Sequence, residues 1–140
     1  MSLETLARSD VVTASPDSSI RDVASMMDEE MVGSVVVTEG DEPVGIVTDR
    51  DLALAVLVDG DDPESATVQD VMSGTVHTIG VDAGFYDATE RMNERNVRRL
   101  PVVDDDGSLV GIITLDDLSE LLADEQSELV GVIREQRAPY

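Results

Sequence analysis

The motif GIVTDRDL at residues 45–52 returns almost unchanged as GIITLDDL at residues 111–118. Each copy starts with a glycine and has a threonine three residues before an aspartate. These shared positions are Thr48, Asp51, Thr114 and Asp117. A motif that occurs twice in a chain of 140 residues indicates an internal repeat. The fold class therefore depends on how far the similarity extends on either side of the motif.

The similarity extends over nearly the whole chain. A shift of 65 residues places Thr13 on Thr78 and Leu3 on Val68. The sequences TASPDSSIRDVASMMDEEMVGSVVV and TIGVDAGFYDATERMNERNVRRLPV then agree at several aspartate, methionine and valine positions. One extra residue in the second turn increases the shift to 66 and superposes the two motifs. The predicted boundaries are a first repeat over residues 1–59, a linker over 60–66, a second repeat over 67–125 and a C-terminal tail over 126–140.

Each repeat is predicted to fold as β-α-β-β-α. A short strand, at residues 11–13 or 76–78, precedes an amphipathic helix, and two apolar runs separated by Gly, Asp and Pro then predict a hairpin. A second helix begins at the T-x-x-D sequence. The side chains expected to point inward from the four helices are Ile20, Val23, Ala24 and Met27; Leu52, Leu54, Ala55 and Leu57; Phe85, Ala88 and Met92; and Leu118, Leu121 and Leu122. Because neither repeat alone buries both faces of its strands, we expect an α+β fold in which the two repeats pack about a pseudo-twofold axis.

The chain is strongly acidic, with 31 Asp and Glu against 9 basic residues and a net charge of −22. Every basic residue is arginine. A field of this sign repels phosphate backbones and anionic lipids, so nucleic acids and membranes are not expected partners. Dispersed carboxylates without lysine suit a protein kept soluble at very high salt, where the Debye length falls to ~3 Å at about 1 M. We therefore expect a halophilic source.

Membrane insertion and disulfide bonds are not expected either. Cysteine is absent, and no stretch reaches the roughly 18 apolar residues of a membrane span. The N-terminal residues lack the basic start and the apolar run of a signal peptide. The expected compartment is the cytoplasm.

The repeated motif has two interpretations. In the first, the glycine permits close packing, and Thr and Asp cap the free N–H groups at the start of a helix. In the second, the motif also binds a ligand: a hydroxyl at a helix N-terminus favours a phosphate, and a nearby carboxylate can accept hydrogen bonds from the two adjacent hydroxyls of a ribose. Both features together would indicate a nucleotide.

Over essentially its full length, the chain resembles a cystathionine-β-synthase (CBS) domain pair, also called a Bateman module. The resemblance rests on the ordered set VTASPDSSIRDVASMM, VGSVVV and GIVTDRDL, followed by VHTIGVD, NVRRLPVVD and GIITLDDL. It implies two copies that form a disc with two related clefts, and modules that pair again into homodimers. The last element of each repeat resembles the signature by which CBS pairs hold adenosine nucleotides.

The resemblance also implies that each motif shares a cleft with the other repeat. The first cleft would combine Thr48 and Asp51 with His77, Thr78, Ile79, Arg98, Arg99, Leu100 and Pro101. The second would combine Thr114 and Asp117 with Thr13, Ala14, Gly33, Ser34 and Val35.

The two expected clefts differ in charge. The second repeat has Arg98 and Arg99 where the first has Gly33 and Ser34. The arginines could form surface ion pairs with nearby carboxylates, or they could attract and bind phosphate within a negative field. We therefore expect the cleft of Asp51 and Arg99 to be the stronger nucleotide site.

The sequence offers no catalytic or metal-binding constellation. His77 is the only histidine, no calcium loop or Walker motif is complete, and no nucleophile has an obvious base. We expect a regulatory, non-enzymatic module with no required cofactor, which binds AMP, ADP or ATP and acts on an unidentified partner protein. The alternative is a structural dimerisation module with empty clefts, and an enzyme is the third and weakest hypothesis.

Overall fold

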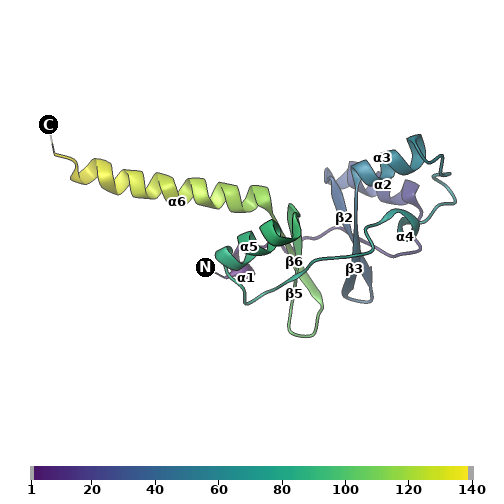
Figure 1. The fold of residues 1–140 in the computed structure, drawn as a ribbon, viewed down its shortest axis with the longest axis horizontal. Helices are drawn as coiled ribbons and strands as arrows, with labels where there is room; N and C mark the ends of the chain where they lie inside the picture. Colours follow the sequence, from purple (N-terminus) through teal and green to yellow (C-terminus); the bar gives the residue numbers. More distant parts are fainter. Residues whose placement is uncertain (1, 139–140) are drawn as a thin grey trace.

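Each repeat folds into a three-stranded mixed sheet with helices packed on it, and the two sheets lie side by side (Figure 1). The computed structural model describes residues 2–138. The elements of the first half are α1 (Leu3–Leu6), β1 (Thr13–Ala14), α2 (Ile20–Glu30), β2 (Ser34–Glu39), β3 (Glu42–Thr48) and α3 (Asp49–Leu57). Those of the second half are α4 (Val68–Val71), β4 (Ile79–Gly80), α5 (Phe85–Arg95), β5 (Arg99–Val103), β6 (Leu109–Thr114) and α6 (Leu115–Gln136). The predicted α+β class and the two β-α-β-β-α repeats are confirmed.

The two sheets have the same topology. In each, the short first strand pairs in parallel with the second, and the second pairs with the third in an antiparallel hairpin. The register places Ser34 opposite Thr48 and Arg99 opposite Thr114, so each motif threonine ends the last strand of its sheet. Strand β1 begins at Thr13, the last residue of its predicted range 11–13, and β4 begins at Ile79, just after the predicted 76–78, because only two residues of each enter the parallel pairing.

Each repeat has its own apolar core. The stripes predicted for the first helices are largely confirmed, with Ile20, Val23 and Met27 buried in one core and Ala88 and Met92 in the other. Ala24 was expected inside but is exposed. The expectation was also wrong at Leu54, Leu57 and Leu122, which are 43%, 82% and 54% exposed. Each second helix meets its sheet mainly through one face near its start, where Leu52, Ala55 and Leu118 are buried.

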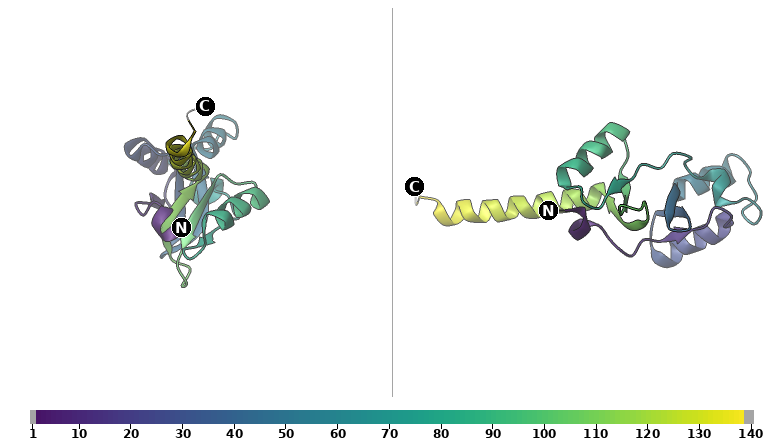
Figure 2. Two further views of the ribbon diagram at one scale, coloured as in Figure 1. Left: turned by 90° about the vertical axis from the view of Figure 1, so that its left-hand side faces the viewer. Right: turned by 90° about the horizontal axis from the view of Figure 1, so that it is seen from below.

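The leading segment of each repeat packs on the other repeat. Leu3 of α1 is fully buried in the second core, and Val68 of α4 is fully buried in the first. The contacts are reciprocal: the N–H of Leu3 donates to the carbonyl of Ala83 at 2.9 Å, and the N–H of Val68 donates to the carbonyl of Ser18 at 2.8 Å. Figure 2 shows the N-terminal segment running from the second repeat to the first. This exchange joins the repeats in the way that a twofold relation between them requires.

The motif glycines allow these crossing segments to approach the sheets. A Cβ on Gly45 would lie 2.5 Å from the sulfur of Met72, and one on Gly111 would lie 2.9 Å from the carbonyl oxygen of Arg8. At such distances a neighbour has to move: the Met72 side chain at Gly45, and the backbone of Arg8 at Gly111. The close-packing role considered for the motif glycine is therefore confirmed.

Helix α6 extends well beyond the second sheet (Figure 1). Most of the segment predicted as a tail, residues 126–140, continues this helix to Gln136, and residues 139–140 lie outside the described part of the chain. Beyond Leu118 the helix exposes several apolar side chains: Leu122, Leu129, Val130, Val132 and Ile133. Even so, no described helix combines the length and the hydropathy needed to cross a membrane.

Candidate functional site

Each T-x-x-D motif forms a reciprocal capping box at a helix N-terminus. The hydroxyl oxygen of Thr48 accepts from the N–H of Asp51 at 3.2 Å, and Asp51 Oδ2 accepts from the N–H of Thr48 at 2.9 Å. Thr114 and Asp117 repeat the arrangement at 3.2 and 3.0 Å. The motifs therefore satisfy the free N–H groups that begin α3 and α6. The capping interpretation is confirmed, and any ligand must use the atoms that remain.

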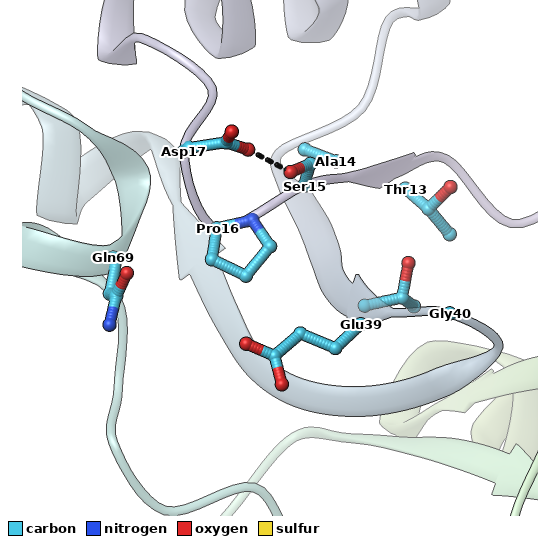
Figure 3. Close-up of a pocket in the computed structure, with 9 residues that line it drawn as sticks. Thr13, Ala14, Ser15, Pro16, Asp17, Glu39, Gly40 and Gln69 are labelled. Atoms are coloured by element: carbon cyan, nitrogen blue, oxygen red, sulfur yellow. Dashed lines mark hydrogen bonds between the residues drawn. The ribbon is translucent and has the colours of Figure 1, made fainter.

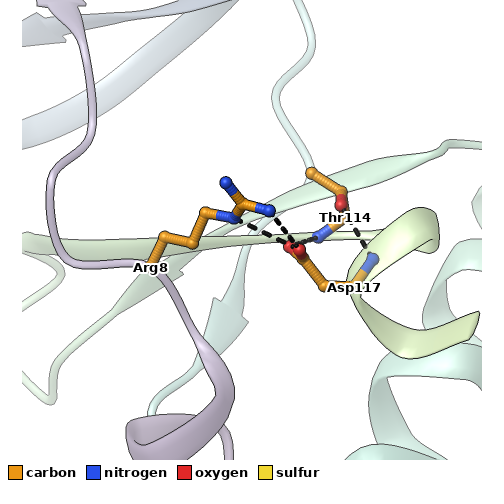
Figure 4. A network of polar contacts seen from close by, with 3 residues as sticks. All are labelled: Arg8, Thr114 and Asp117. Atoms are coloured by element: carbon orange, nitrogen blue, oxygen red, sulfur yellow. Dashed lines mark hydrogen bonds and ion pairs between the residues drawn. The ribbon is translucent and has the colours of Figure 1, made fainter. Parts of the chain in front are cut away.

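The two motif carboxylates differ in their second oxygen. Asp51 Oδ1 accepts no hydrogen bond from residues 2–138. Asp117 Oδ1 accepts two from Arg8, at 2.8 Å from Nη2 and 3.2 Å from Nε (Figure 4). Burial raises the pKa of Asp117, but hydrogen bonds from Arg8 and Thr114 outweigh it and hold that pKa below its usual value. The Asp117 carboxylate is thus ionised and already paired.

One cleft between the repeats, here called the His77 cleft, has a volume of about 280 Å³. Its lining residues are Ile46, Ser73, Thr75, Val76, His77, Asn96, Val97, Arg98 and Arg99. It combines His77, Arg98 and Arg99 of the second repeat with Ile46 of strand β3 of the first, whereas the resemblance implied Thr48 and Asp51 at this place. Thr48 and Asp51 do not line it themselves, but Ile46 is only two residues before Thr48 on the same strand.

The opposite cleft, here called the Ser34 cleft, is larger, at about 410 Å³. It brings Thr114 together with Gly33 and Ser34 of the first repeat, which is part of the expected crossed grouping, but Asp117 is not among its lining residues. The structure adds Arg8 and Arg99 to it, together with acidic Asp10, Glu30 and Asp116. Arg99 lines both clefts, so the positive charge that the sequence assigned to one cleft is shared between them.

Several predicted site residues lie elsewhere. Four of them are buried and line neither cleft: Ile79, Leu100, Pro101 and Val35. The carbonyl of Thr78 accepts from Arg91 at 3.0 Å.

Thr13 and Ala14 line a separate hollow, which also includes Ser15, Pro16, Asp17, Thr38, Glu39, Gly40 and Gln69 (Figure 3). Thr13 and Ala14 form strand β1 and pair with β2 outside the Ser34 cleft. The residues just before them, Val11 and Val12, line that cleft instead. The hydroxyl of Ser15 donates to Asp17 in this hollow, and Glu39 adds a second carboxylate. Two carboxylates without a cation among the lining residues disfavour an anionic ligand there.

Arg8 is the important residue that sequence reasoning missed. It lies between the matched positions Leu3 and Thr13, outside the motifs that carry the resemblance, so its equivalence with Ser73 carried no obvious functional signal. The shift of 65 residues nevertheless pairs the two positions, and the exchange of leading segments brings Arg8 to the second motif.

The arginine pair is only partly engaged by carboxylates. Arg98 Nη2 lies 3.9 Å from Asp116 Oδ1, and both side chains are mostly exposed. Within residues 2–138, Arg99 forms no ion pair. No group of three or more His, Asp or Glu side chains in the same residues is placed to hold a metal ion. Arg99 is thus the cation most available to a ligand in either cleft.

A comparison with known proteins gives consistent matches. A family model described as a CBS domain matches residues 3–58 and 68–124. The chain is 39% identical over 141 residues to an uncharacterized protein of Methanopyrus kandleri, covering 100% of this chain and 70% of that protein. It is 38% identical over 109 residues to the CBS domain-containing protein YhcV of Bacillus subtilis, covering 78% of this chain and 76% of that one. The solved CBS domain pair of protein MJ0100, in complex with 5-methylthioadenosine and S-adenosyl-L-methionine, is similar with a TM-score of 0.78 and 25% identity over 89% of this chain and 98% of that one.

Proposed function

Because the chain belongs to the CBS-domain family and contains two CBS domains, we propose that it is a regulatory module that binds an adenine nucleotide and signals ligand occupancy to a partner protein. The ligand would bind between the repeats, with its ribose at a motif aspartate and its phosphate near the arginine pair. Occupancy would act through different affinities for two arrangements of the module or of its homodimer.

The observation that carries the proposal is the free oxygen of Asp51. Capping uses only Oδ2, so Oδ1 is left to accept a ribose hydroxyl beside the N-terminus of α3. A nucleotide placed there would have its phosphate close to the N-terminus of α3, where the helix dipole and the free N–H groups favour anions.

The charge distribution supports a phosphorylated ligand. In a chain with a net charge of −22, Arg98 and Arg99 lie next to each other in the His77 cleft. The guanidinium of Arg99 is free to form two hydrogen bonds with phosphate oxygens. The adenosyl ligands of the MJ0100 domain pair support the adenosine part of the proposal.

A ligand panel tests the proposal directly. Thermal melting at one fixed high salt concentration, with AMP, ADP, ATP, S-adenosylmethionine or 5-methylthioadenosine, should raise the Tm in proportion to the logarithm of ligand concentration above its Kd. GMP is the matched control for the base. An unchanged Tm with every adenine ligand would contradict the proposal.

A second candidate function is a structural dimerisation module whose clefts stay empty. The capping boxes favour it, because they explain why Thr and Asp stand in both motifs without any ligand. The ligand panel separates the two functions, since a purely structural module gains no stability from nucleotides. In either case we propose that the module forms a homodimer, that it has no catalytic activity of its own, and that its acidic surface is suited to concentrated salt.

A further inference from the structure

The two motif aspartates differ in whether a ligand can reach them. Both use Oδ2 to accept the backbone N–H of their own threonine. Asp51 Oδ1 has no hydrogen-bond partner in the described part of the chain, whereas Asp117 Oδ1 holds Nη2 and Nε of Arg8 (Figure 4). Arg8 therefore covers the part of Asp117 that corresponds to the open oxygen of Asp51.

Arg8 and Ser73 occupy equivalent places in the two repeats. Arg8 forms an antiparallel bridge with Ile112, and Ser73 forms one with Ile46. In both cases the backbone N–H donates to the carbonyl of the partner at 3.0 Å. The hydroxyl of Ser73 donates to the carbonyl of Thr75 at 3.0 Å, away from the motif. The same backbone position thus supplies a guanidinium to one motif aspartate and nothing to the other.

We propose that Arg8 makes the Asp117 carboxylate inaccessible to uncharged adenosine, so that each chain binds one adenosine, at Asp51. The inference rests on the proposed function, because it takes the motif aspartates as acceptors of ribose hydroxyls. A carboxylate can hold both hydroxyls of a ribose only while its lone pairs are free, and Arg8 occupies those of Asp117 Oδ1. Adenosine has no anionic group that would draw the guanidinium away from a carboxylate.

A single substitution should remove this block without harming the fold. The side chain of Arg8 is 64% exposed, whereas that of Asp117 is 12% exposed. Shortening Arg8 therefore leaves no hole in a core, and Asp117 keeps the capping bond from Thr114. Serine is the natural replacement, because it already occupies the equivalent position 73 with the same backbone bridge.

Calorimetric titration with adenosine, at one fixed salt concentration, tests the inference by stoichiometry. The parent should bind one adenosine per chain, and Asp51→Asn should bind none. Adding Arg8→Ser to Asp51→Asn should restore one site, now at Asp117, and adding Asp117→Asn as a third change should abolish it again. A restored site cannot result from unfolding, and Arg8→Gln, which keeps the aliphatic stem, should restore it as well.

The reciprocal change closes the other site. Ser73→Arg places a guanidinium beside Asp51 and should weaken adenosine binding by about tenfold or more, the loss expected for a hydrogen bond to a charged group. Arg8→Ser alone should give two sites per chain and leave the affinity at Asp51 unchanged.

The outcomes separate the inference from the proposed function. Two sites in the parent, or one site in the parent with none in the combined Asp51→Asn and Arg8→Ser variant, would overturn the role of Arg8 while leaving nucleotide binding in place. If neither the parent nor Arg8→Ser binds adenosine, ribose recognition by the motif aspartates fails and this inference fails with it, whereas the proposed function is tested separately by the panel of adenine ligands.

Discussion

At the scale of single residues, structural and ligand-binding roles fall on different atoms of the same side chain. Asp51 Oδ2 completes a capping box, and Oδ1 faces no partner among the described residues. Asparagine at this position keeps an oxygen for the cap but loses the carboxylate charge. Asp51→Asn should therefore change ligand binding and leave the cap in place, whereas Asp51→Ala would remove both the cap and the ligand contact.

Arg99 is expected to bind phosphate rather than base or sugar. Arg99→Ala should weaken AMP binding by about tenfold or more, the range for a hydrogen bond between charged groups, and should leave adenosine binding nearly unchanged. Titration of the parent and the variant with both ligands checks this, and adenosine is the internal control. An equal loss for adenosine and AMP would indicate structural damage instead.

The ion pair of Arg8 and Asp117 should make part of the stability depend on pH. Because the folded-state pKa of Asp117 lies below its usual value, the stabilisation is complete above the unfolded pKa of about 4 and is lost as the pH falls through the folded pKa. Thermal melting should therefore show a Tm difference between the parent and Asp117→Asn at pH 7 that shrinks as the pH is lowered toward 3.

Arg8→Ser is the matched control for this pH series. Without the guanidinium, the pKa of Asp117 returns toward its usual value. The Tm difference between Arg8→Ser and the double variant that carries both Arg8→Ser and Asp117→Asn should therefore depend less on pH. A Tm difference between the parent and Asp117→Asn that stays constant from pH 7 to 3 would contradict the assignment.

At the scale of secondary-structure elements, the short helices contribute more to the fold than their length suggests. Helices α1 and α4 have four residues each, yet each supplies a fully buried side chain to the core of the other repeat. Helix α6 has 22 residues, but beyond its first turns it is exposed. Burial rather than helix length decides what an element contributes to stability.

Substitutions in α1 and α6 should show this contrast. Leu3→Ala should lower the free energy of unfolding by about 2–5 kcal/mol, because it opens a cavity in the second core. Leu129→Ala, at a side chain that is 64% exposed, should change it by no more than about 0.5 kcal/mol. Denaturant unfolding at constant salt gives both values. Equal effects would show that the N-terminal segment is not part of the second core.

At the scale of the whole molecule, the net charge of −22 sets the conditions under which copies can associate. Two such chains repel each other across any interface at low ionic strength. At about 1 M salt the Debye length falls to ~3 Å, and this repulsion is largely screened.

We therefore expect a homodimer at multimolar salt that dissociates as the salt is diluted. Sedimentation velocity across a salt series measures this, with far-UV circular dichroism at each concentration to confirm that the subunits stay folded. A monomer at every salt concentration would rule out the dimer. A dimer that binds more tightly at low salt would show that charge repulsion does not limit its stability.

The repeat, its β-α-β-β-α pattern and the capping role of the two T-x-x-D motifs could all be predicted from the amino-acid sequence. These features depend on local spacing and on residues close together in the chain, which a sequence displays directly. For the same reason the helix stripes were mostly correct near the helix starts, where each helix meets its own sheet.

The exchange of leading segments between the repeats, and its effect on the clefts, became visible in the folded chain alone. Arg8 and Asp117 are 109 residues apart, and no local pattern links them. The repeat alignment treats the two motifs as equals, but the crossing segments bring an arginine to one and a serine to the other. Contacts between distant segments depend on how the cores pack, so the difference between the two aspartates exists only in the folded chain.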